Sequence, residues 1–69
     1  MNLSDKIIAV GKMQKYIDAH FEEEITLEDL SHAANYSKFH AERIFKELTG
    51  KTPFEVIRAL RLTKAIQNW

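Results

Sequence analysis

Apolar side chains recur at intervals of three and four residues along most of the chain, which is the spacing of one face of a helix. The first such series is Val10, Met13, Ile17 and Phe21. Ser4 is a residue type that caps helix starts, and an acidic run at 22–24 follows the series. The pattern predicts a first helix that begins after Ser4, ends near His20–Phe21 and is followed by a solvated connection.

A second, shorter helix is predicted after Thr26. Thr26 and Asp29 stand three residues apart, as in a capping box, where each side chain bonds the other residue's backbone N–H. The inward positions of this helix are Leu27, Leu30 and Ala34. Asn35 tolerates a left-handed backbone, and Ser37 can cap the next helix. Two helices joined by so short a turn cross at a large angle, which predicts a helix-turn-helix arrangement.

A third helix is predicted over residues 38–49 and a fourth from Pro53 onward. Gly50 can end the third helix, Thr52 can cap the fourth, and proline suits a first helical position. The apolar positions of the fourth helix are Phe54, Ile57, Leu60 or Leu62, Ala65 and Trp69. No glycine or proline follows to stop this helix, so we expect the chain to be a piece of a longer one. The predicted fold class is all-α.

The stretch SKFHAERIFK, residues 37–46, places apolar and charged side chains on two different faces of the third helix. The charged face carries Lys38, Glu42, Arg43, Lys46 and, among these charges, Phe39. A large aromatic side chain on a charged face indicates a binding surface. The alternative is that Phe39 folds back on Tyr36 or on another helix and closes the edge of the core.

The charged residues are unevenly distributed along the chain. The 69 residues carry no net charge, which argues against a nucleic-acid-binding protein. However, residues 1–35 hold three basic and seven acidic residues, whereas residues 36–69 hold seven basic and three acidic ones. Chance and helix-end preferences can produce such an asymmetry. It also places the positive excess on the half that contains the third helix.

The residues that could carry other chemistry form no recognisable site. The chain has no cysteine, and His20, His32 and His40 follow no metal-ligand spacing. It shows no nucleophile–base pair and no glycine-rich phosphate loop. We therefore predict no enzyme activity, no catalytic residue, no metal and no cofactor. No apolar run is long enough for a membrane span, so we expect a cytoplasmic protein without membrane contact.

Over about residues 8–69, the chain resembles the first helix-turn-helix unit of the AraC-type transcription regulators. The resemblance rests on L-E-D-L-S-x-A-A-x-Y-S, S-K-F-H-x-x-R-I-F-K-E-L-T-G, P-F-x-x-I and R-L-x-x-A, of which the second is the most specific. The chain departs from the family pattern at Asn35, where glycine is usual, at Ser31, where alanine is usual, and at Ala41, where leucine is usual. The last departure implies a smaller core anchor on the third helix.

The resemblance implies that the chain binds double-stranded DNA, with helix 38–49 as the recognition helix in the major groove. It implies base contacts by Phe39, Glu42 and Arg43. Arginine suits guanine, glutamate can accept a hydrogen bond from cytosine, and an apolar side chain can touch a thymine methyl group. The alternatives are an ion pair between Arg43 and Glu47 and a charge ladder of Glu42 with Lys38 and Lys46.

Phosphate contacts are expected from Ser37, Lys38 and Lys46. Lys51, Arg58, Arg61 and Lys64 could extend the basic surface, although Arg61 could equally support a helix junction. Family members carry a second helix-turn-helix unit and often an effector domain, which this chain does not match. The fourth helix would then leave apolar surface open, and self-association is possible. The competing interpretation of the whole chain is a small helical module for protein–protein interaction.

Overall fold

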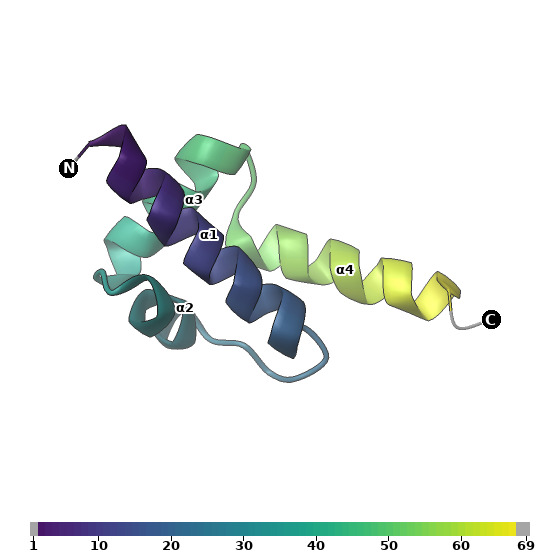
Figure 1. The fold of residues 1–69 in the computed structure, drawn as a ribbon. Helices are drawn as coiled ribbons and strands as arrows, with labels where there is room; N and C mark the ends of the chain where they lie inside the picture. The colour runs from purple at the N-terminus through teal and green to yellow at the C-terminus, as the bar shows by residue number, and fades with distance from the viewer. Residues whose placement is uncertain (1, 68–69) are drawn as a thin grey trace.

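The computed structural model describes residues 2–67, which form four helices and no strand. They are α1 (Leu3–His20), α2 (Leu27–Ala34), α3 (Lys38–Thr49) and α4 (Pro53–Gln67). Helices α1, α2 and α3 pack into a three-helix body, and α4 runs outward from it (Figure 1). The molecule is therefore elongated, with extents of 43 × 20 × 15 Å. The all-α prediction is confirmed.

The core of the three-helix body draws on all three of its helices. Met13 and Ile17 from α1, Leu30 from α2 and Phe45 from α3 have no exposed surface. Each such side chain contributes about 1.5–3 kcal/mol by leaving water. Ala41 is also completely buried, so the small anchor expected from the sequence lies inside the core. The predicted apolar faces of α1, α2 and α3 are thus the packed faces.

The start of α1 corrects a prediction. Ser4 does not cap this helix; Asn2 does, with its side-chain oxygen accepting the backbone N–H of Asp5 at 2.9 Å. Asparagine and serine are equally good caps, and both stand at the start of this chain. The Asn2 cap starts the helix earlier and places Ser4 inside its first turn. The end of α1 at His20 agrees with the prediction.

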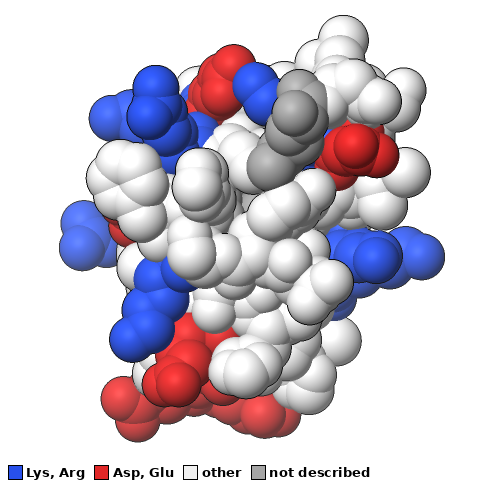
Figure 2. Space-filling view, turned by 90° about the vertical axis from the view of Figure 1, so that its left-hand side faces the viewer, with Lys and Arg blue, Asp and Glu red and all other residues white. Residues whose placement is uncertain are grey.

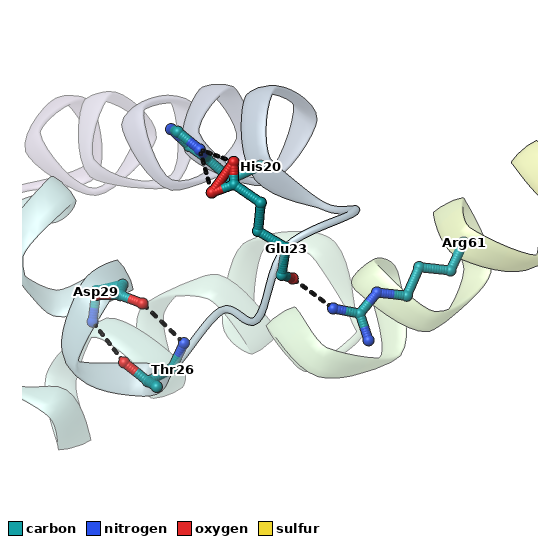
Figure 3. Close-up of polar contacts among 5 residues, drawn as sticks. All are labelled: His20, Glu23, Thr26, Asp29 and Arg61. Carbon is teal, nitrogen blue, oxygen red and sulfur yellow. Dashed lines mark hydrogen bonds and ion pairs between the residues drawn. The ribbon is translucent and has the colours of Figure 1, made fainter.

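The caps predicted around the turn are confirmed. Asp29 N–H donates to Thr26 Oγ1 at 3.1 Å, and Thr26 N–H donates to the Asp29 carboxylate at 3.0 Å, which completes the capping box (Figure 3). Asn35 ends α2 in the left-handed conformation with φ of 61°, and Gly50 ends α3 with φ of 79°. Ser37 caps α3. Of these residues, Asn35 and Ser37 stand between α2 and α3 and form the short turn that joins them.

Helix α4 starts with a capping box that the sequence analysis did not identify. Glu55 N–H donates to Thr52 Oγ1 at 3.2 Å, and Thr52 N–H donates to the Glu55 carboxylate at 3.3 Å. These bonds lower the pKa of the Glu55 carboxyl group, because they stabilise its ionised form. Helix α4 thus begins as firmly as the helices of the body.

A few contacts join α4 to the three-helix body. Ile57 is buried, and Val56 and Leu60 lie partly buried against the core. Arg61 donates through Nε to the carbonyl of Phe21 and through Nη2 to the carbonyl of Glu23, both at 2.6 Å. Figure 3 shows this guanidinium reaching the connection between α1 and α2. Arg61 therefore supports the junction between α4 and the α1–α2 connection, which was one of the two roles open to it from the sequence.

The outer part of α4 is largely exposed to solvent. Leu62 and Ile66 are 63% and 62% exposed, in agreement with the expected open apolar surface. Ala65 is also exposed. The predicted apolar position Trp69 lies outside the described residues.

Candidate nucleic-acid interface

Helix α3 buries one face and exposes the other. Ala41, Ile44 and Phe45 point into the body. Phe39 is 70% exposed, and its ring meets the edge of His40 with 6.1 Å between ring centroids. Phe39 therefore does not fold back into the core. The sequence correctly placed this aromatic side chain on the wet face.

Arg43 lies one turn further along this surface and is exposed. The alternative partner, Glu47, is engaged elsewhere: Lys6 of α1 places its Nζ 3.1 and 3.3 Å from the two carboxylate oxygens of Glu47. Within residues 2–67, the Arg43 guanidinium has no hydrogen bond or ion pair. Its fork of donors is available to an external acceptor.

Glu42 does not form the predicted charge ladder. Across the described part of the chain, the ion pairs within 4.0 Å are Lys6–Glu47 and His20–Glu23, and neither involves Glu42. A pair between long exposed side chains gains a few tenths of a kcal/mol and restricts their rotamers. Glu42 is partly buried, whereas Lys38 and Lys46 are exposed. The two lysines keep their ammonium groups in water.

The hydroxyl of Ser37 has two local partners at the start of α3. It accepts the backbone N–H of His40 at 3.3 Å, and it lies 3.1 Å from Nδ1 of the same residue. No acidic residue stands in the first turn of α3, although α1, α2 and α4 each carry at least one there. The positive end of the α3 dipole is thus left without a carboxylate, which favours an external anion.

Acidic side chains are concentrated at one edge of the molecule. Figure 2 shows Asp and Glu side chains along the lower edge of one face, at the level where the α1–α2 connection lies in Figure 1. Lys and Arg side chains lie at its upper and lateral margins together with further Asp and Glu side chains, and uncharged surface lies between. The hydrogen bonds from Thr26 lower the pKa of the Asp29 carboxyl group, because they stabilise its ionised form.

Lys6 and His40 were missed as residues of this surface. Both line a hollow between α1 and α3, together with Arg43, Ile44 and Glu47. Lys6 lies in the acidic half of the sequence, 41 residues from Glu47, and no local pattern links the two. His40 could have been found, because it stands three residues after the capping Ser37.

Other kinds of site find no support in the described residues. From residue 2 to residue 67, no three His, Cys, Asp or Glu side chains gather closely enough to hold a metal ion. None of the described helices combines the length and the apolar character needed to cross a membrane.

Helices α2 and α3 are joined by a short turn in which Asn35 has a left-handed backbone, and α3 exposes an aromatic ring and an arginine. This arrangement defines a helix-turn-helix protein. The family model of the bacterial regulatory helix-turn-helix proteins of the AraC family matches residues 17–58. The chain belongs to this family. It is a DNA-binding helix-turn-helix subdomain of a transcription regulator, in agreement with the resemblance found in the sequence.

Several curated proteins are similar to the chain. The transposon Tn10 TetD protein of Escherichia coli is 40% identical over 50 residues, covering 72% of this chain and 36% of TetD. The right origin-binding protein of Escherichia coli strain K12 is 36% identical over 72% of this chain and 17% of its own length. The multiple antibiotic resistance protein MarA of Salmonella typhimurium is 32% identical over 88% of this chain and 48% of MarA. The chain thus spans half or less of these relatives, and no solved structure matches it significantly.

Proposed function

We propose that α3 is the recognition helix and that it enters the major groove, with Phe39, Glu42 and Arg43 facing base edges. The observation that carries this proposal is the pair formed by Phe39, 70% exposed, and Arg43, exposed one turn away with its donors available. Arginine can bond O6 and N7 of guanine with two parallel hydrogen bonds, and the Phe39 ring suits a thymine methyl group. Glu42 would accept a hydrogen bond from cytosine N4.

In this arrangement Ser37, Lys38 and Lys46 contact phosphates. Lys38 and Lys46 are exposed on either side of Arg43 along α3, which suits them to the two margins of a groove. The start of α3, which has no carboxylate in its first turn, would add its backbone N–H groups. The acidic edge of the α1–α2 connection would face away from the DNA, because it would repel the phosphates.

We further infer that residues 1–69 act as one subdomain of a longer cytoplasmic regulator, in which α4 leads to a second helix-turn-helix unit. The chain covers 48% of MarA and smaller shares of the other relatives, which leaves room for further units. The exposed Leu62 and Ile66 of α4 would then pack against the following unit, and an effector domain would complete the parent protein.

The test compares Arg43→Ala with Lys46→Ala on matched and single-base-changed duplexes at several salt concentrations. Arg43→Ala should lose about 1–3 kcal/mol of discrimination at one base pair and little non-specific binding. Lys46→Ala should weaken binding to every sequence alike and lower the salt slope by about one unit. Because one unit has few contacts, we expect a dissociation constant of about 10⁻⁴–10⁻⁶ M at physiological salt. A base preference that follows Lys46 and not Arg43 would refute the assignment.

The second candidate function is protein–protein interaction, which the exposed Phe39, Leu62 and Ile66 favour. Salt dependence separates the two candidates. Phosphate contacts release counterions, so DNA binding should weaken steeply with salt, whereas apolar packing should not.

A further inference from the structure

The ion pair between Lys6 and Glu47 joins two helices at the hollow that Arg43 lines. Lys6 Nζ reaches both oxygens of the Glu47 carboxylate, at 3.1 and 3.3 Å. The Lys6 side chain keeps 26% of its surface exposed and that of Glu47 50%. The pair is therefore accessible to solvent, and both of its residues line the same hollow as Arg43.

Arg43 and Glu47 stand four residues apart on α3, which is the spacing at which opposite charges on a helix meet. Without Lys6, the Glu47 carboxylate would have Arg43 as its neighbouring cation along this ridge. An Arg43–Glu47 pair would occupy the guanidinium fork that base recognition needs. In the structure, the Glu47 carboxylate instead pairs with Lys6, and the Arg43 guanidinium makes no ion pair among the described residues.

We propose that Lys6 is a positioning residue for Arg43: by holding the Glu47 carboxylate, it keeps the guanidinium free for DNA. This inference rests on the proposed role of Arg43 in base recognition. It assigns a function to a lysine of the acidic half of the chain, on a helix that does not enter the groove. Lys6 also neutralises a carboxylate that would otherwise repel nearby phosphates.

The first test needs no DNA. The Nε–Hε resonance of Arg43 is recorded by nuclear magnetic resonance in the chain and in Lys6→Met, Glu47→Gln and the double variant. Lys6→Met should shift the resonance, because Glu47 turns to Arg43, and adding Glu47→Gln should return it. Glu47→Gln by itself should leave it in place. An unchanged resonance in Lys6→Met, or a shift that persists in the double variant, would overturn the proposal.

The second test measures binding to a matched duplex. Lys15→Met is the charge-matched control, because Lys15 is an exposed lysine of the same helix. We expect Lys6→Met to bind about two-fold more weakly than Lys15→Met, which is the size of a helical ion pair expressed as an equilibrium constant. Glu47→Gln should restore the binding of Lys6→Met.

The two tests separate the possible failures. If Lys6 instead contacts a phosphate itself, the double variant will stay as weak as Lys6→Met, and the positioning role is wrong. If the unaltered chain shows no affinity for DNA, the proposed function fails. The Arg43 resonance would still decide whether Lys6 holds Glu47 away.

Discussion

The three-helix body and α4 are held by different means. In the body, Met13, Ile17, Leu30 and Phe45 are wholly enclosed, and three helices share that core. Helix α4 has a firm start in its Thr52–Glu55 box, but past Arg61 its described side chains are exposed. The body is stabilised by side chains brought together from three helices, whereas α4 is stabilised at one end.

Because of this difference, the fold of the body and the direction of α4 depend on different contacts. A lone helix of about 15 residues is marginal in water, so the outer turns of α4 depend on what packs against them. The body needs no such support, because α3, the proposed recognition helix, is held by buried contacts on its inner face. We infer that the surface for DNA is prearranged, whereas the direction in which α4 leaves is adjustable.

The largest expected effect contrasts a core side chain with one on α4. Phe45→Ala should lower the free energy of unfolding by about 3–5 kcal/mol, because it opens a cavity in the core of a small domain. Leu62→Ala should change it by less than about 0.5 kcal/mol, since Leu62 is 63% exposed. Urea unfolding followed by circular dichroism measures both. Equal losses in the two variants would show that α4 belongs to the cooperative core.

The second prediction concerns the turn of the body. Asn35 has φ of 61°, where a β-branched side chain is strained, so Asn35→Val should cost about 1–2 kcal/mol. Asn35→Gly is the matched control and should be close to neutral, because glycine adopts this conformation readily. Thermal unfolding of the two variants decides the point. A glycine variant as unstable as the valine variant would mean that the asparagine side chain, and not the backbone, matters.

The turn also shows what can be predicted from sequence. Each correctly predicted cap involves residues at most four apart, such as Thr26 and Asp29, so the information lies within about one turn of helix. The exposed Phe39 followed from helical spacing in the same way. The choice between Asn2 and Ser4 could not be made, because both residue types cap equally well.

The contacts that the sequence could not predict join distant segments. Lys6 and Glu47 are 41 residues apart, and Arg61 and Phe21 are 40 apart. Their meeting depends on how the helices pack, which no local pattern encodes. Conversely, the ladder of Glu42 with two lysines was predicted from spacing but is not formed, and such pairs gain only a few tenths of a kcal/mol.

The third prediction tests whether Arg61 sets the direction of α4. Arg61→Met should lose about 0.5–1.5 kcal/mol, the net worth of exposed hydrogen bonds, and should free α4 to swing. Spin labels at the exposed positions Lys12 and Lys64 should give a broader distance distribution in this variant. Arg58→Met is the control, because the Arg58 guanidinium has no hydrogen bond among the described residues. Equal distributions in both variants would mean that the packing of Ile57 is sufficient.

The smallest effect is expected from acid, which acts on the two capping boxes. Thr26 lowers the pKa of Asp29 in the body, and Thr52 lowers that of Glu55 in α4, in each case through hydrogen bonds to the ionised form. A carboxyl group with a lowered folded pKa stabilises the fold above its ordinary pKa, which is 3.8 for Asp29 and 4.5 for Glu55. This stabilisation is lost as the pH falls through the folded value. We therefore expect stability to decline below about pH 4.5.

The two boxes should respond differently to the same protonation. Loss of the Asp29 box should lower the unfolding midpoint of the whole body, because α2 is part of its core, and Asp29→Asn should reduce this acid dependence. Loss of the Glu55 box should loosen the first turn of α4 locally. The exchange of the Glu55 amide, which donates to Thr52 Oγ1, should then quicken in acid relative to amides of α3, beyond the intrinsic pH effect. If both boxes moved only the global midpoint, the body and α4 would form one cooperative unit, and the contrast between them would be wrong.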